Sequence, residues 1–368
     1  MTEEQDVLRS DWLAEALISW YRGVARDLPW RQTNEAYKIW LSEAMLQQTQ
    51  VATVIPYYHR FLQAFPTVFD LANAPQDRVL KLWEGLGYYA RARNLHKAAQ
   101  RIVQDMGGEF PKTLAAIEGL PGIGRSTAGA IMSFVYGART PILDGNVKRV
   151  LARWMDEPEP IDVPKVTHRL WQASQSLVDA ASDPAILNQS LMELGATLCL
   201  PKQPRCLVCP VSTHCRAFQH GTHHERPVVK KRSPIPHHHI GAGILQDEAS
   251  RVLIQQRPQS GLLGGLWEFP GGKQQAGESL QETVQRELFE ELGITVSVGA
   301  KIAQVKHAYS HFRITLHAFW CRLISGEPKP LAAEDMRWVT IEQLSDFAFP
   351  KANHAILSHL TESVYPGT

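Results

Sequence analysis

Four cysteines in this chain are spaced closely enough to share one metal centre. They follow the pattern C-x6-C-x2-C-x5-C, and prolines inside the run keep the connecting loops out of helix. Zinc sites built from cysteine usually have two separated C-x2-C pairs, whereas one pair with unequal flanking gaps fits a [4Fe–4S] cluster better. The run therefore predicts an iron–sulfur loop over 199–215, with zinc or four unrelated buried thiols as the alternatives. The predicted ligands are Cys199, Cys206, Cys209 and Cys215.

Two carboxylates are candidates for acid–base chemistry. Glu43 is the only charged residue in the largely apolar, helix-like stretch 40–50, and burial there would raise its pKa as a general acid requires. Asp144 stands directly before Gly145 and a predicted helix. Two carboxylates in different environments can break a glycosidic bond, one by protonating the leaving group and one by stabilising the sugar cation. From the residues alone, a structural glutamate and a helix-capping aspartate are the simpler interpretations.

A glycine-containing turn over 120–130 could bind a phosphate. Its sequence, LPGIGRSTAGA, allows a tight turn with positive φ at Gly122 and Gly124, and the helix that follows directs backbone N–H groups outward. The pattern resembles the hairpin of a helix-hairpin-helix motif, which grips one DNA strand without reading bases, and a plain αα-corner is the alternative. The region 81–153 contains 11 Lys and Arg against 5 Asp and Glu, so cations gather where phosphate contacts are expected.

The elements that must position these residues fall into two classes. From about residue 10 to 216, apolar residues recur with a helical period, and beyond residue 237 the pattern becomes mixed α/β. Examples are helices over 36–53, 76–86 and 283–292 and strands over 251–256 and 314–323. We therefore predict a multidomain chain: an all-α domain over 1–218, a linker over 219–236 and an α/β (α+β) domain over 237–368.

Composition bounds the class of protein. The chain has 368 residues, 44% of them hydrophobic, and this length and hydrophobic content are enough for two domains of ordinary size. Its net charge is +1. It contains no apolar run long enough to cross a bilayer, and its acidic start is neither a secretory signal nor a transit peptide. Clustered thiols without such a signal indicate a reducing compartment, so we expect a cytoplasmic protein with no membrane partner.

Several motifs together point to one family. They are LPWR (28–31), WLSEAMLQQTQV (40–51), GLGYYARARNL (85–95), LPGIGRSTAGAI (120–131), LDGNVKRV (143–150) and the four-cysteine run. With them, nearly the whole chain resembles the MutY adenine DNA glycosylases, members of the helix-hairpin-helix superfamily that includes endonuclease III. The resemblance implies excision of adenine mispaired with 8-oxoguanine, or with guanine, in duplex DNA during base excision repair. It also implies a [4Fe–4S] cofactor, and we expect a nucleoid-associated monomer.

The resemblance assigns roles to the site residues. Glu43 would protonate the adenine and then activate water, Asp144 would stabilise the sugar cation at C1′, and Asn146 would orient both. Adenine must leave the base stack before its glycosidic bond is accessible. The residues expected to probe or wedge the duplex are Gln48, Leu86 and Tyr88.

Position 126 predicts the outcome for the DNA strand. Bifunctional relatives carry a lysine there that attacks the sugar and cuts the strand through a Schiff base. Ser126 cannot form one. The hairpin residues Gly122, Gly124 and Ser126 are expected to bind DNA, and we predict a monofunctional enzyme that leaves an abasic site.

The C-terminal domain resembles a Nudix hydrolase, which the family uses to recognise 8-oxoguanine. In the family the Nudix signature is generally incomplete, but here Gly272–Ile294 matches every defined position. Glu287, Glu290 and Glu291 are spaced i, i+3 and i+4, so they share a helix face that could hold Mg²⁺ against a diphosphate. An ancestral signature kept for folding and a live Mg²⁺-dependent hydrolase both remain open.

A short loop is expected to contact the lesion. The resemblance places lesion reading at Tyr309, Ser310 and His311, where the family typically has Phe-Ser-His. Tyr309 keeps the aromatic ring, but its added hydroxyl needs a polar neighbour or water.

Three rival functions are weighed against this one. They are an endonuclease III-like glycosylase/lyase for oxidised pyrimidines, a nucleotide-pool Nudix hydrolase with a DNA-binding appendage, and a non-catalytic iron–sulfur DNA-binding module. Ser126 and the C-terminal domain argue against the first. The Glu43 and Asp144 pair argues against the second, and only inert carboxylates would favour the third.

Overall fold

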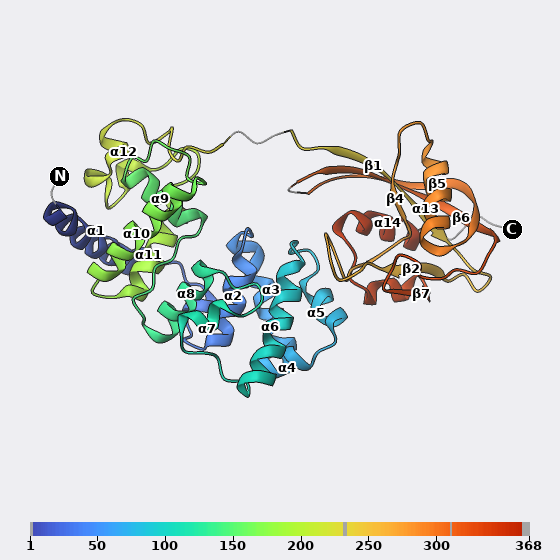
Figure 1. Ribbon diagram of the computed structural model, residues 1–368, viewed down its shortest axis with the longest axis horizontal. Helices are drawn as coiled ribbons and strands as arrows, with labels where there is room; N and C mark the ends of the chain where they lie inside the picture. The colour runs from blue at the N-terminus through green and yellow to red at the C-terminus, as the bar shows by residue number, and fades with distance from the viewer. Residues whose placement is uncertain (1–2, 231–233, 310, 363–368) are drawn as a thin grey trace. The chain divides into compact units, whose positions relative to one another are not determined.

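The computed structural model describes residues 3–230, 234–309 and 311–362, and Figure 1 follows the chain from blue to red. Contacts divide the chain into two compact units. The first contains residues 1–72 and 97–232, and the second contains residues 73–96 and 233–368. A short helical segment, 73–96, is thus grouped with the C-terminal residues, which the sequence pattern does not indicate. The predicted linker over 219–236 stays a prediction.

The first unit is helical. Its elements are α1 (Glu3–Val24), η1 (Pro29–Arg31), α2 (Ala36–Leu46), α3 (Val51–Ala64), α4 (Val68–Asn73), α7 (Leu114–Glu118), α8 (Arg125–Tyr136), α9 (Gly145–Trp154), α10 (Pro164–Ala180), α11 (Pro184–Thr197), η2 (Cys206–Val208), η3 (Ser212–His214) and α12 (Arg216–Gln219). Helix α6 (Ala90–Met106) begins in the second unit and ends in the first.

One buried core joins α1, α9, α10 and α11. It includes Leu17, Leu170 and Leu191, which are fully buried. In α9, Val147 and Leu151 face this core because residues four apart lie on the same side of a helix. This packing fixes the start of α9, the position of Asp144.

The prediction of one uninterrupted helix over 36–53 is wrong. Helix α2 ends at Leu46, and α3 begins at Val51. Gln48 lies in the break with a φ of 56°, a left-handed conformation that is unfavourable for residues with a Cβ. The polar run QQTQ over 47–50 is the sequence signal for this break. The helix expected over 76–86 likewise ends early, at Trp83.

The second unit combines α5 (Gln76–Trp83) with two sheets. Its other elements are β1 (His237–Leu245), β2 (Val252–Gln256), β3 (Trp267–Glu268), β4 (Gly271–Lys273), α13 (Leu280–Leu292), β5 (Thr295–Ala308), β6 (Arg313–Ser325), β7 (Asp335–Val339), η4 (Glu342–Asp346) and α14 (Lys351–Glu362). The strand orders are β4-β1-β6-β5 and β3-β2-β7, and β1 and β6 are parallel.

Two hydrophobic clusters hold this unit together. Leu288 and Leu292 of α13 pack with Phe319 of β6, and Ile356 and Leu360 of α14 pack in a separate cluster. Helix α13 starts with a capping box in which Ser279 and Glu282 satisfy each other's backbone N–H groups. The expected fold class, a helical domain followed by a mixed α/β domain, is confirmed. Every helix in the described ranges is too short or too polar to cross a membrane.

Candidate functional site

Glu43 lies on α2 and lines a pocket in the helical unit. Trp30, Phe134 and Met192 provide apolar walls, and Arg31 and Gln189 add polar groups. Burial, together with the smaller effect of the negative charge of Asp144, raises the pKa of Glu43 to about 8. The Glu43 carboxyl group therefore stays protonated at neutral pH and can donate a proton to a ligand in this pocket.

Asp144 is both a helix cap and a partly buried carboxylate. Its Oδ1 accepts a hydrogen bond from the Val147 N–H at 2.7 Å, and its Oδ2 accepts one from Asn146 Nδ2 at 3.3 Å. Burial raises the pKa of Asp144, while the hydrogen bonds from Val147 and Asn146 lower it in part. The capping interpretation and a position close to Glu43 are therefore compatible.

Asn146 is held from its other side. Arg149 Nη2 donates to Asn146 Oδ1 at 2.8 Å and to the Gly195 carbonyl at 2.7 Å, and Arg149 Nε donates to the Cys199 carbonyl at 2.7 Å. A Cβ on Gly195 would stand 2.6 Å from the Asn146 Cβ, so only glycine allows α11 to approach α9 this closely. One arginine thus links the Asn146 amide to the cysteine loop.

The hairpin departs from expectation at one glycine. Gly122 has a φ of 76°, as predicted, but Gly124 has a φ of −93° and caps α8 in extended conformation. The expected positive φ at Gly124 is therefore wrong. Apart from its chain neighbours, no atom of the described residues lies within 4 Å of the place where its Cβ would stand, which leaves the turn open to close approach by a ligand. Ser126 Oγ accepts a hydrogen bond from the Leu143 N–H at 3.1 Å, which ties the hairpin to the segment before Asp144.

The three residues expected to probe the duplex lie in two units. Gln48 is exposed in the break after α2, whereas Leu86 is buried and Tyr88 is 40% exposed in the second unit. Tyr88, like Gln48, has a positive φ, at 49°. Strained φ values in side-chain-bearing residues gather at functional sites, so this geometry supports a role for both.

All four cysteines of the 199–215 run line one cavity. Burial raises the pKa of Cys209 to about 12 and of Cys215 to about 11, and the neighbouring thiols also disfavour the thiolates. The buried Arg153 donates to Cys199 Sγ at 3.2 Å and to the Leu200 carbonyl at 2.7 Å. Four sulfurs around one cavity fit a polynuclear cluster, whose positive metal ions would stabilise the thiolates. No group of three His, Cys, Asp or Glu side chains in the described ranges could hold a single metal ion, so the four sulfurs surround a cavity without converging on one metal position.

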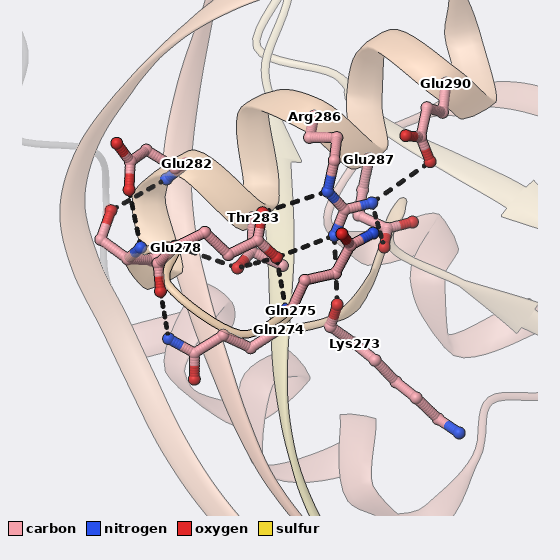
Figure 2. A network of polar contacts seen from close by, with 10 residues as sticks. Lys273, Gln274, Gln275, Glu278, Glu282, Thr283, Arg286, Glu287 and Glu290 are labelled. Atoms are coloured by element: carbon pink, nitrogen blue, oxygen red, sulfur yellow. Dashed lines mark hydrogen bonds and ion pairs between the residues drawn. The ribbon is translucent and has the colours of Figure 1, made fainter.

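Figure 2 shows how the Nudix-box carboxylates are arranged around Arg286. Its guanidinium lies 2.9 Å from Glu287 and from Glu278 and 3.2 Å from Glu290. Hydrogen bonds from Arg286 lower the pKa of Glu278 to about 2. Glu291 instead accepts hydrogen bonds from the Gly271 N–H and from Gln255 Nε2, at 2.9 and 2.8 Å. Burial raises the pKa of Glu291 to about 7.

Tyr309 packs against Phe312 and lies within reach of the charges of Arg257 and Glu268. Its ring stacks on Phe312 with centroids 4.8 Å apart, and its N–H donates to the Phe312 carbonyl at 2.9 Å. Burial raises the pKa of Tyr309 to about 12, with opposing effects from the charges of Arg257 and Glu268. His311 is exposed, and Ser310 lies outside the described residues.

Comparison with known proteins identifies the family. The chain matches the model of an HhH-GPD superfamily base excision DNA repair protein over residues 41–175 and that of a NUDIX domain over residues 241–359. The adenine DNA glycosylase of Homo sapiens is 36% identical over 408 residues, which cover 96% of this chain and 74% of that protein. The chain belongs to the adenine DNA glycosylase family. Its reaction is therefore adenine excision from DNA in base excision repair.

Solved structures agree with this fold. A thermostable thymine-DNA glycosylase has a TM-score of 0.53 and 26% identity, covering 57% of this chain and 97% of that one. A trapped endonuclease III–DNA covalent intermediate has a TM-score of 0.50 and 20% identity, covering 60% of this chain and 99% of that one. The helical fold of this adenine DNA glycosylase is thus shared with a thymine-DNA glycosylase and with endonuclease III.

Sequence reasoning missed some residues that build this site. Trp30 and Arg31 line the pocket, and they stand inside LPWR, to which no role was assigned. Glu193 fixes Arg31 through an ion pair of 2.8 Å. Arg149 follows Asn146 by three residues, a helical spacing that could have suggested their contact. Phe134 and Gln189 carry no sequence signal because their elements are distant in the chain.

Proposed function

We propose that this adenine DNA glycosylase hydrolyses the N-glycosidic bond of adenine opposite 8-oxoguanine or guanine in duplex DNA. The observation that carries the proposal is the pair of partly buried carboxyl groups. Glu43 has a pKa of about 8 and lines a pocket, and the charge of Asp144 is close enough to contribute to that pKa. Different environments for two carboxyl groups are what a glycosidic cleavage needs.

In this mechanism the adenine leaves the base stack and enters the pocket beside Glu43. The protonated Glu43 donates its proton to the base, and the C1′–N9 bond breaks as electrons move to the adenine. Asp144 stabilises the positive sugar with its carboxylate, which Val147 and Asn146 keep oriented. Glu43, now ionised, then accepts a proton from the water that adds to C1′.

Ser126 supports a monofunctional outcome. A Schiff base requires an amine close to C1′, and this hairpin position offers a hydroxyl that accepts a hydrogen bond from Leu143. The product is therefore an intact strand with an abasic site. We assign phosphate binding to the hairpin that contains Gly122, Gly124 and Ser126.

The cysteine loop is proposed to hold a [4Fe–4S] cluster. Cys199, Cys206, Cys209 and Cys215 would bind it, and it would supply structural closure of the loop. Arg153 and Arg149 hydrogen bond to backbone carbonyls of this loop, and Arg149 also holds Asn146. Order in the loop therefore supports the orientation of Asp144 through Asn146.

Lesion recognition is assigned to both units. Tyr309, Ser310 and His311 would contact 8-oxoguanine, and Gln48, Leu86 and Tyr88 would occupy the gap in the duplex. The stacked pair Tyr309 and Phe312 supports this assignment, because an aromatic pair with one polar edge suits a modified base. One copy of the chain contains all the proposed residues, so we propose that it acts as a monomer.

A single-turnover assay tests the main proposal. The substrates are duplexes with one adenine opposite 8-oxoguanine, guanine or thymine, and half of each reaction is treated with hot alkali. The proposal predicts cleavage at the adenine opposite 8-oxoguanine or guanine only after alkali. Cleavage without alkali would refute the reading of Ser126, and equal cleavage opposite thymine would refute the mispair preference.

A second activity is favoured by the complete Nudix signature. Glu287 and Glu290 both contact Arg286, which Mg²⁺ would have to displace to use them against a diphosphate. We propose Mg²⁺-dependent hydrolysis of a nucleoside triphosphate by this box. Purified protein with Mg²⁺ and 8-oxo-dGTP should release phosphate or pyrophosphate, and Glu290→Gln should abolish the release. Absence of release from every nucleoside triphosphate tested would rule the activity out.

A further inference from the structure

The helical segment 73–96 forms hydrogen bonds with the C-terminal residues within the second unit. Gln76 Nε2 donates to Gln259 Oε1 at 2.6 Å, and Gln256 Nε2 donates to Asp77 Oδ1 at 2.8 Å. Arg93, which is buried, donates to the Gly264 carbonyl at 2.6 Å. These contacts place a helical part of the glycosylase fold in one body with the Nudix-like strands.

Glu84 accepts several hydrogen bonds in this contact. Its Oε1 accepts hydrogen bonds from the Phe349 N–H at 2.8 Å and from His354 Nε2 at 3.2 Å. Its Oε2 accepts one from Lys81 Nζ at 2.7 Å, and the same ammonium donates to the Phe347 carbonyl at 2.9 Å. One carboxylate therefore joins the end of α5 to the residues that lead into α14.

The contact between the end of α5 and residues 347–354 is called the joint below. The Glu84 carboxylate is well suited to hold it. Its side chain is only 13% exposed, and burying a charge is costly unless it is fully paired. Burial alone would raise the pKa of Glu84, but hydrogen bonds from His354, Lys81 and the Phe349 N–H lower it below its ordinary value. Glu84 is therefore ionised at neutral pH, and its bonds are charge-assisted.

The joint stands directly beside a loop with left-handed backbone, which is strained at Tyr88. Gly85, Gly87 and Tyr88 all have positive φ, at 95°, 72° and 49°. The loop is fixed again on its far side, because the Gly85 N–H donates to the Tyr89 hydroxyl and that hydroxyl donates to the Phe349 carbonyl. Both ends of the loop over 85–88 thus contact the same residue ahead of α14.

We propose that Glu84 is a positioning residue that fixes the 85–88 loop to residues 347–354. Binding of the lesion by the C-terminal residues would then orient Tyr88 as well, because the two segments are joined at this carboxylate. The identity of the base opposite adenine, recognised by the C-terminal residues, thereby influences how efficiently Tyr88 occupies the gap in the duplex. This inference rests on the proposed recognition of 8-oxoguanine.

Substitution of Glu84 by glutamine tests the joint with little change in shape. The amide nitrogen of Glu84→Gln must face Lys81 or the Phe349 N–H, and both are donors. The control is Glu248→Gln, which makes the same chemical change at an exposed position of the same unit. A second variant, His354→Ala, keeps the Glu84 carboxylate and removes one of its donors.

Two readouts separate positioning from simple stability, both on the full-length protein with its cluster. Hydrogen exchange in the absence of DNA should become faster over residues 84–90 and 347–354 in Glu84→Gln and unchanged in Glu248→Gln. The second readout is the ratio of the single-turnover excision rate opposite 8-oxoguanine to the rate opposite guanine. This ratio should fall about tenfold in Glu84→Gln and should fall less in His354→Ala.

The possible results have distinct meanings. An unchanged rate ratio, or two rates that fall equally with a lower Tm, would overturn the positioning role. Unchanged hydrogen exchange in Glu84→Gln would overturn the joint itself, whatever the excision rates show. A wild-type enzyme without preference for 8-oxoguanine would overturn the proposed lesion recognition and the specificity role with it, while the exchange data would still report on the joint.

Discussion

Replacement of Glu43 by glutamine should make the enzyme slower and, at neutral pH, more stable. With a pKa of about 8, roughly 90% of Glu43 is protonated at pH 7, against roughly 0.3% at the ordinary carboxyl pKa of 4.5. Glutamine matches the shape of the protonated side chain but cannot transfer a proton. Loss of a general acid typically costs on the order of 10²- to 10⁴-fold in rate, so we expect a loss of that size in single-turnover excision.

The stability effect follows from the same pKa. A carboxyl group whose folded pKa is raised stabilises the fold below the unfolded-state pKa of 4.5, and this stability is lost as the pH rises toward about 8. Between pH 5 and pH 7.5 the wild type should lose about 3 kcal/mol through Glu43, a loss that Glu43→Gln does not share. The Tm of the variant relative to the wild type should therefore rise by roughly 5–10 °C between these pH values.

Thermal unfolding at one scan rate, at pH 5 and pH 7.5, measures this difference. The control is Glu118→Gln, an exposed glutamate on α7 in the same unit, whose Tm relative to wild type should not depend on pH. If Glu43→Gln shifts the Tm equally at both pH values, Glu43 is not a buried protonated acid. If the variant excises adenine within about threefold of the wild-type rate, proton donation by Glu43 is refuted.

Three further predictions concern the residues around Asp144. Ser126→Lys should form a Schiff base with an abasic site, which borohydride traps, and Ser126→Ala should give no trapped complex. Both variants should lower the free energy of unfolding by about 1 kcal/mol, because the hydrogen bond from the Leu143 N–H is lost. Arg149→Met should reduce excision about 10- to 100-fold when compared at equal content of the proposed cluster, because Asn146 Oδ1 loses its donor. An unchanged rate would show that Asn146 needs no such support. Gly195→Ala should lower the free energy of unfolding by about 1–3 kcal/mol and slow excision, because the added Cβ meets Asn146. The control is Gly145→Ala, which has open space at its Cβ among the described residues and should not cause such a clash.

Much of the fold could be predicted from the sequence, because periodicity reports which side of an element is buried. The strands over 251–256 and 314–323 and the helix over 283–292 match β2, β6 and α13 closely. The break after α2 is not predicted, because a polar run such as QQTQ also fits the exposed face of a continuous helix and so does not by itself place a break. The grouping of 73–96 with the C-terminal unit could not be predicted either, because contacts between distant segments leave no periodic signal in the sequence.

The candidate site was predicted as a set of residues and not as a geometry. Motifs named Glu43 and Asp144, but the pocket wall contributed by Phe134 and the link from Arg149 to the cysteine loop come from chain segments folded together. Asp144 also shows why a simple interpretation and a catalytic one need not compete. The hydrogen bond that caps α9 is the one that orients the carboxylate.

The central claim is that Glu43 and Asp144 act as one unit on adenine opposite 8-oxoguanine. The most direct test measures adenine release under single-turnover conditions by the wild type, Glu43→Gln, Asp144→Asn and the double variant. Because both carboxyl groups serve the same bond cleavage, each single variant should lose at least about 100-fold, and the double variant should be little slower than the worse single variant. A single variant that keeps nearly the full rate, or losses that multiply in the double variant, would contradict the account.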